Sequence, residues 1–159
     1  MNLRVYVDAK IEGRHVKESP KNAFVAYVVE GDPNLRGFAP VDATETDEAE
    51  LQAVAFAIRE LKDRFDRFTI ICDHESVVSE MNRKESKLVK RRPILKKILE
   101  ARALNPLICF ESLPPNPAHK FLNQRLKELK EREMRIQAEY LEKSYSSEEE
   151  RDHDSFESL

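Results

Sequence analysis

Hydrophobic positions in the first forty residues follow the two-residue period of β-strands. Residues 3–7 carry apolar side chains at every second position, and residues 23–29 are rich in β-branched and aromatic side chains. Residues 36–41 form a third candidate strand, which Pro40 restricts to an edge or an end of a sheet. Turn-forming residues separate the first two segments, so we expect these strands to pair as antiparallel hairpins.

The hydrophobic period then changes to that of a helix. From residue 47 to about residue 65, apolar side chains recur at three- and four-residue steps, which predicts an amphipathic helix. The continuously apolar residues 68–72 are typical of a strand buried inside a sheet. Farther along, the pattern predicts helices over residues 76–83 and 93–104 and a strand over residues 107–113. A final helix follows, with Asn116 as N-cap and Pro117 at its first position.

This order of elements predicts an α/β fold. Three strands joined by hairpins form an antiparallel meander, and strands that are entered through helices add in parallel. We therefore expect a mixed five-stranded sheet, with three antiparallel strands followed by parallel strands, flanked by helices.

The length of 159 residues suits one domain with an appendage. We expect a folded domain over residues 1–130, a helical extension over residues 131–143 and an acidic, disordered tail over residues 144–159. Apolar residues of the extension recur at heptad-like steps, so it is a candidate for self-association or for binding a protein partner.

The two cysteines and the first residues of the sequence indicate where in the cell the protein is located. Cys72 and Cys109 each lie in an apolar run, which favours buried free thiols. The sequence opens directly on a strand-like segment, which leaves no room for a signal peptide, and no apolar run reaches the ~18 residues of a membrane helix. We expect a cytoplasmic protein.

The net charge of −3 conceals a basic block between residues 83 and 102 and an acidic C-terminal end. Basic side chains in one block can contact the phosphate backbone of a nucleic acid without reading its sequence. The alternative is a solvated helical surface. The candidates for nucleic-acid binding are Lys84, Lys87, Lys90, Arg91, Arg92, Lys96 and Lys97.

Three carboxylates carry the candidate chemistry. Asp8 ends the first strand, Glu50 lies in the first turn of the first helix, and Asp73 ends the fourth strand. Each alone could cap or close its element. Neighbouring parallel strands, however, place their carboxyl ends at one edge of a sheet, where carboxylates repel one another unless a cation lies between them. Such oxygen ligands suit two Mg²⁺ or Mn²⁺ ions about 3.5–4 Å apart, the arrangement for in-line attack on a phosphodiester.

The segments around these carboxylates resemble the ribonuclease H family. They are Val5-Tyr-Val-Asp8, Glu48-Ala-Glu50-Leu-Gln-Ala53 and Ile70-Ile-Cys-Asp73-His-Glu-Ser-Val77, and the resemblance extends from about residue 3 to about residue 126. It implies that Asp8, Glu50 and Asp73 bind the metal ions. It also implies that the protein is an endonuclease that hydrolyses the RNA strand of RNA/DNA hybrids by a two-metal mechanism.

The chain departs from the family pattern at the start of its last helix. The family has a fourth acidic residue there, in a segment resembling Asn-x-x-Ala-Asp, whereas this chain has Asn116-Pro-Ala118-His119. His119 either replaces the acid as a fourth catalytic metal ligand, since imidazole binds borderline metals, or is a surface residue of a decaying site. The stretch before Glu50, Glu45-Thr-Asp47, is also more acidic than its Thr-Asn-Asn-like counterpart.

Three functions fit these observations. The first is the hybrid-cleaving endonuclease, with Asp8, Glu50, Asp73 and His119 as its site. The second is a catalytically inactive module of the same fold that binds nucleic acid or a protein. The third is a nuclease of this fold that acts on branched DNA. His74 and Glu75 follow Asp73 directly, and we assign them to the start of the following helix.

Overall fold

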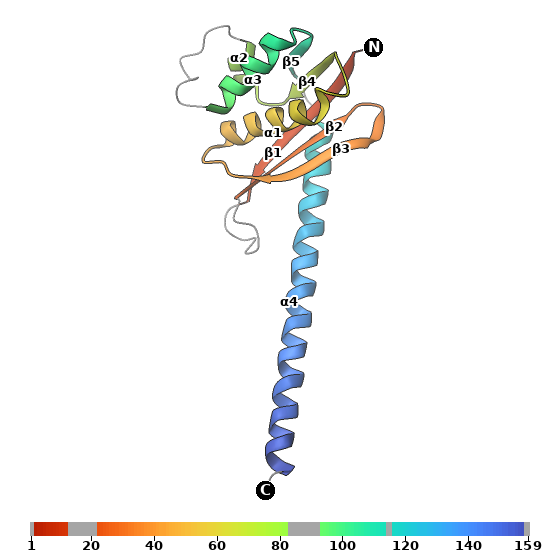
Figure 1. The fold of residues 1–159 in the computed structure, drawn as a ribbon, viewed down its shortest axis with the longest axis vertical. Coiled ribbons are helices and arrows are strands. Elements are labelled where there is room, and N and C mark those ends of the chain that lie inside the picture. Colours follow the sequence, from red (N-terminus) through yellow and green to blue (C-terminus); the bar gives the residue numbers. More distant parts are fainter. Residues whose placement is uncertain (1, 13–21, 83–92, 114–115, 158–159) are drawn as a thin grey trace. The chain divides into compact units, whose positions relative to one another are not determined.

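The computed structural model describes residues 2–12, 22–82, 93–113 and 116–157. Within these ranges the chain forms five strands and four helices, in the order that the hydrophobic pattern predicts (Figure 1). In chain order they are β1 Leu3–Ile11, β2 Ala23–Val29, β3 Asp32–Val41, α1 Thr46–Leu61, β4 Phe68–Cys72, α2 Glu75–Asn82, α3 Pro93–Leu104, β5 Ile108–Ser112 and α4 Pro117–Glu157.

The five strands form one mixed sheet in the order β3-β2-β1-β4-β5. Strands β1, β2 and β3 pair antiparallel, while β4 is parallel to both β1 and β5. The predicted fold class is confirmed. Strand β3 lies at the edge of the sheet, as Pro40 requires, but it begins at Asp32 rather than at residue 36.

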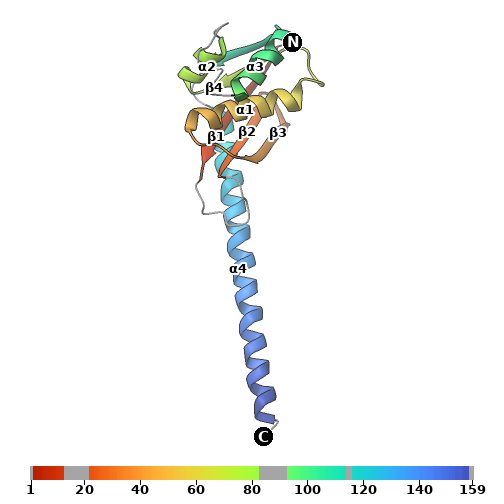
Figure 2. The ribbon, with the colours of Figure 1, turned by 60° about the vertical axis from the view of Figure 1, so that its left-hand side comes forward.

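Helices α1, α2 and α3 cover one face of the sheet (Figures 1 and 2). Their buried side chains, such as Leu51, Val77 and Leu95, form one core with the residues of the strands that face them, such as Val5 and Ile70. Because β4 lies inside the sheet, all five of its residues are buried, as its continuously apolar sequence predicts. On the opposite face, Tyr6 and Ile71 pack with Ala118 from the start of α4.

The chain divides into two compact units, Met1–Gln124 and Arg125–Leu159. The expected boundaries at residues 130 and 143 stay predictions, as does self-association through the C-terminal helix. Helix α4 continues to Glu157, although the acidic composition predicts disorder from residue 144. Glutamate is a good helix former, and this stretch has neither glycine nor proline to end the helix. Of the helices in the described ranges, none combines the length and the apolar character that crossing a membrane requires.

The expectation that both cysteines are buried is wrong for Cys109. Cys72 is buried in β4, whereas Cys109 is exposed. Strand β5 is an edge strand in which burial alternates, so that Ile108 and Phe110 face the core and Cys109 faces away from it.

The predicted nucleic-acid-binding residues divide between two parts of the chain. Lys84, Lys87, Lys90, Arg91 and Arg92 lie outside the described residues. Lys96 and Lys97 lie on α3, and both are exposed.

Candidate active site

The parallel pairing of β1 and β4 brings Asp8 and Asp73 to the same level of the sheet. Tyr6 pairs with Ile71 at the end of this ladder, and Asp8 and Asp73 each lie two residues farther along the chain. Asp8 is 4% exposed, whereas the side chain of Asp73, one residue beyond the end of β4, is 35% exposed. One carboxylate is thus fixed in the sheet and the other lies at its solvent-facing edge.

Hydrogen bonds at the start of α1 place Glu50 beside these two aspartates. The Asn22 side chain bonds the backbone of Ala43 through both its oxygen and its nitrogen, which ties β2 to the segment that leads into the helix. The Glu48 carboxylate accepts hydrogen bonds from the backbone and the hydroxyl of Thr44. Glu48 therefore stabilises the helix start, and Glu50, two residues farther along α1, is directed into the protein.

Glu50 is a buried carboxyl group in a cluster of negative charge. Its side chain is 1% exposed, and the thiol of Cys72 donates to its Oε2 at 3.5 Å. Burial is the largest cause that raises the pKa of Glu50, to about 9, and the negative charges of Asp8 and Asp73 add to it. Burial likewise raises the pKa of the Cys72 thiol. The ionised form of Glu50 therefore needs a cation close by.

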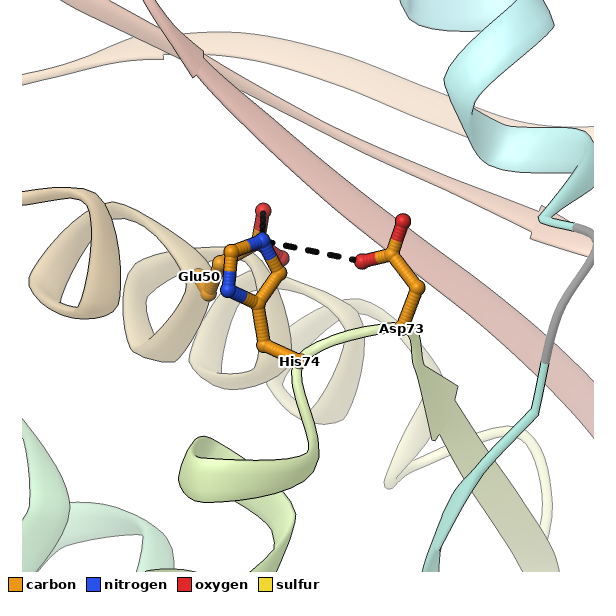
Figure 3. A group of neighbouring side chains, drawn as sticks. All are labelled: Glu50, Asp73 and His74. Atoms are coloured by element: carbon orange, nitrogen blue, oxygen red, sulfur yellow. Dashed lines mark ion pairs between the residues drawn. The ribbon is translucent and has the colours of Figure 1, made fainter.

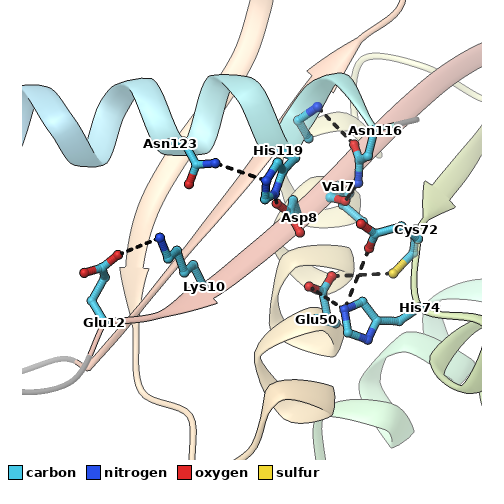
Figure 4. A network of polar contacts seen from close by, with 12 residues as sticks. Val7, Asp8, Lys10, Glu12, Glu50, Cys72, His74, Asn116, His119 and Asn123 are labelled. Carbon is cyan, nitrogen blue, oxygen red and sulfur yellow. Dashed lines mark hydrogen bonds and ion pairs between the residues drawn. The ribbon is translucent and has the colours of Figure 1, made fainter. Parts of the chain in front are cut away.

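His119 contacts Asp8 directly (Figure 4). Asn116 caps α4 as predicted, because its Oδ1 accepts from the Ala118 N–H at 3.0 Å. Its Nδ2 donates to the carbonyl of Val7, which fixes the start of α4 beside β1. The result is a distance of 2.8 Å between His119 Nδ1 and Asp8 Oδ2, while Asn123 Nδ2 donates to His119 Nε2 at 3.1 Å.

His74 also faces the carboxylates, which the sequence reasoning missed (Figure 3). Its carbonyl accepts from the Val78 N–H, so its backbone does serve the start of α2 as expected. Its side chain, however, lies with Nε2 at 3.4 Å from Glu50 Oε1 and 3.8 Å from Asp73 Oδ1. The signal in the sequence was its position directly after the strand-ending Asp73.

Within the described ranges, one group of side chains combines three potential metal ligands at short mutual distances. One atom each of Glu50, Asp73 and His74 lies within 4.8 Å of the other two. Asp8 is close enough to Glu50 to raise its pKa both by charge and through a side-chain hydrogen bond. Carboxylate oxygens with an imidazole nitrogen at the rim are a donor set that suits a divalent cation.

Solved structures show which fold this arrangement belongs to. LC11-RNase H1 in complex with an RNA/DNA hybrid superposes with a TM-score of 0.59 at 20% identity, over 77% of this chain and 95% of that one. The fold is ribonuclease H-like. The N-terminal RNase H domain of rv2228c from Mycobacterium tuberculosis matches with a TM-score of 0.57 at 16% identity, over 82% of this chain and 98% of that one.

RNase H1 from the halophilic archaeon Halobacterium salinarum shows the same fold with a TM-score of 0.50 at 18% identity, over 72% of this chain and 86% of that one. Comparisons with protein-family models and with curated protein sequences found no match to this chain. At these identities the likeness establishes the fold, and the chemistry has to be argued from the side chains.

Proposed function

We propose that this protein is a metal-dependent endonuclease of ribonuclease H type, which hydrolyses the RNA strand of RNA/DNA hybrids. The observation that carries the proposal is the cluster of Asp8, Glu50 and Asp73 at the edge where β1 and β4 run in parallel. Open α/β sheets place their ligands at this edge. The ribonuclease H-like fold of structures such as LC11-RNase H1, solved with a hybrid, supports the substrate class.

The carboxylates fit two divalent cations, Mg²⁺ or Mn²⁺. Asp8 and Glu50 are almost completely buried and lie close together, an arrangement that is unfavourable for two negative charges unless positive charge compensates them. In the proposed site, Asp8, Glu50 and Asp73 hold the ions. When bound, such a pair of ions supplies an activated water and stabilises the departing oxygen of the phosphodiester.

His119 is proposed as the fourth residue of the site. Its contact with Asp8 favours the interpretation that His119 replaces the fourth acid over the interpretation that it is a surface residue, because the imidazole contacts a carboxylate of the cluster. Its side chain is 62% exposed, so the ring is also open to a substrate at the surface. Asn116 fixes where the ring stands, through its bonds to Val7 and Ala118.

Nucleic-acid binding by the basic block is part of the same proposal. Lys96 and Lys97 on α3 are exposed and carry positive charge that phosphate groups attract. If these lysines and those between residues 84 and 92 contact the DNA or RNA backbone, the affinity falls steeply with salt concentration. The proposed binding is sequence-independent.

A specific observation favours a second candidate, the inactive binding module. Both ring nitrogens of His119 have protein partners, Asp8 and Asn123, so the hydrogen-bonding capacity of this imidazole is satisfied without a metal ion. In that case the fold would bind nucleic acid or a protein without cleaving it.

Cleavage of an end-labelled RNA/DNA hybrid, in Mg²⁺ and in Mn²⁺, tests the proposal. Single-stranded RNA, duplex DNA and a four-way junction serve as competing substrates. We expect hybrid-selective cutting that falls by about 100-fold or more in Asp8→Asn and in Asp73→Asn, because each removes an ionised ligand. Asp63→Asn is the matched control, since it makes the same change at an exposed residue between α1 and β4.

The outcome separates the candidates. Hybrid cutting that the two site variants lose and Asp63→Asn keeps would support the nuclease. Preferential cutting of the junction would favour the nuclease for branched DNA. Folded protein that cuts no substrate in either metal would contradict the enzyme and leave the binding module.

A further inference from the structure

His74 stands opposite the two carboxylates with a ring nitrogen directed at both. Nε2 is 3.4 Å from Glu50 Oε1 and 3.8 Å from Asp73 Oδ1. Figure 3 shows the ring facing the two carboxylates. Two donor atoms that are each ~2.1 Å from one small divalent ion lie ~3.0–3.4 Å apart. The two separations from His74 are close to this range, and one atom each of Glu50, Asp73 and His74 lies within 4.8 Å of the other two, so small movements of these side chains would bring three donors onto one ion.

The other ring nitrogen of His74 faces a further carboxylate. Nδ1 lies 4.0 Å from Asp47 Oδ1. Asp47 and Glu50 are three residues apart on α1, so one turn of the helix offers a carboxylate to each side of the ring. Metal-ligating histidines commonly donate their second ring N–H to a carboxylate, which fixes the tautomer and the ring orientation.

We propose that His74 is a nitrogen ligand of the metal site, and that it shifts the preference of the site from Mg²⁺ toward transition-metal ions such as Mn²⁺ and Co²⁺. The inference rests on the proposed function, because it concerns the same carboxylates. Mg²⁺ favours oxygen ligands, whereas imidazole favours first-row transition metals. In this proposal Asp47, whose Oδ1 lies 4.0 Å from Nδ1, is a positioning residue that accepts the ring N–H once the ring moves toward it.

A different role for His74 makes the opposite prediction. A protonated imidazole between Glu50 and Asp73 would neutralise the cluster in place of a metal ion. Removing it would then leave the carboxylates more negative, and every divalent cation would bind more tightly. If His74 is a ligand, its removal weakens binding, and transition-metal ions lose more than Mg²⁺ does.

Calorimetric titration of the full-length protein with Mn²⁺, Co²⁺ and Mg²⁺ distinguishes these roles. We expect His74→Ala to weaken Mn²⁺ and Co²⁺ binding by about tenfold or more and to change Mg²⁺ binding less. Asp47→Asn should shift the preference in the same direction by a smaller factor. Unchanged or tighter binding of the transition-metal ions in His74→Ala would overturn the proposal.

The same titration keeps this inference separate from the proposed function. Asp73→Asn removes a carboxylate of the site and should abolish binding of all three ions. If the unaltered protein binds none of them, or if Asp73→Asn binds them normally, both the metal site and the inference fail. If only His74→Ala is without effect, the inference fails and the carboxylate site stands.

A spectroscopic readout identifies the nitrogen itself. His119 is also in the site, so the measurement is made in the His119→Asp background, where an acid replaces that imidazole. We expect the electron spin echo of bound Mn²⁺ to show ¹⁴N modulation there and to lose it when His74→Ala is added. Absence of the modulation before that second change would contradict the proposal. His74→Asn provides a second variant that keeps a polar side chain should the alanine variant not fold.

Discussion

Glu50 is the least exposed of the buried polar and charged side chains among the described residues. It is buried, accepts from the Cys72 thiol, and has Asp8 and Asp73 as neighbours. Helix α1 brings its carboxyl group to this position, while Glu48, two residues earlier in the helix, bonds Thr44. The low exposure makes ionisation costly, and two neighbouring carboxylates add to the cost. The stability of the metal-free protein therefore depends on the protonation state of the Glu50 carboxyl group.

We predict that the metal-free protein loses stability as the pH rises toward 9. Burial first, and then the charges of Asp8 and Asp73, raise the pKa of Glu50 in the folded state from 4.5 to about 9. Between these values the folded state binds more protons than the unfolded state, so the free energy of unfolding falls with rising pH. One pKa unit corresponds to about 1.4 kcal/mol. Urea unfolding in EDTA at a series of pH values measures the slope.

Glu50→Gln is the control for this slope, because the amide keeps the shape and cannot ionise. The variant should lose stability more slowly across the same pH range. Saturating Mn²⁺ should restore stability to the unaltered protein at high pH, because it binds the ionised carboxylates of the folded state. Equal slopes for the two proteins in EDTA would contradict the prediction.

At the scale of elements, one side chain joins the last helix to the first strand. Asn116 accepts from the Ala118 N–H as the N-cap of α4 and donates to the carbonyl of Val7 in β1. Val7 precedes Asp8, and His119 lies in the first turn of α4. The contact between Asp8 and His119 thus depends on how Asn116 connects the two elements.

We predict that Asn116→Ala lowers the free energy of unfolding by about 2 kcal/mol. Loss of an N-cap costs about 1 kcal/mol, and loss of a partly buried hydrogen bond costs a similar amount. Asn116→Asp retains the capping oxygen and loses the donor to Val7, so its effect should be about half as large. The midpoint of urea unfolding, at an unchanged denaturant slope, measures both. An Asn116→Ala midpoint equal to that of the unaltered protein would rule out this connecting role.

At the scale of the whole molecule, the buried hydrophobic residues lie between Val5 and Leu126 in the described ranges. The compact unit Met1–Gln124 contains Asp8, Glu50, Asp73, His74 and His119. Stability of a domain comes mainly from burial of apolar surface in its core. The core and the candidate site therefore need little of the chain beyond the first turns of α4.

We predict that a chain ending at residue 130 folds with nearly the stability of the full-length protein. All buried core residues are retained, so the free energy of unfolding should change by less than about 1 kcal/mol. Mn²⁺ binding should be retained as well. Thermal and urea unfolding followed by circular dichroism provide the comparison. Loss of a single cooperative transition on truncation would show that residues 131–159 contribute to the domain.

The sequence by itself determined the elements and singled out the three carboxylates of the candidate site. Alternating and helical periods identify the strands and helices because burial of one face imposes these periods. They predicted the mixed sheet, the edge position of β3 from Pro40, and the N-cap at Asn116. The proximity of Asp8 and Asp73 was also predictable from the parallel pairing of their strands, but the prediction that Asp8 ends the first strand is wrong, because β1 continues to Ile11 along β2.

Only the tertiary structure decided where side chains of separate elements meet. The exposure of Cys109 depends on the edge position of β5, and the contact of His119 with Asp8 depends on how α4 docks against β1. The His74 ring faces carboxylates on α1, of which Glu50, the nearer in the sequence, is 24 residues away. These are contacts between residues distant in the chain, and local periodicity carries no information on their distances or orientations.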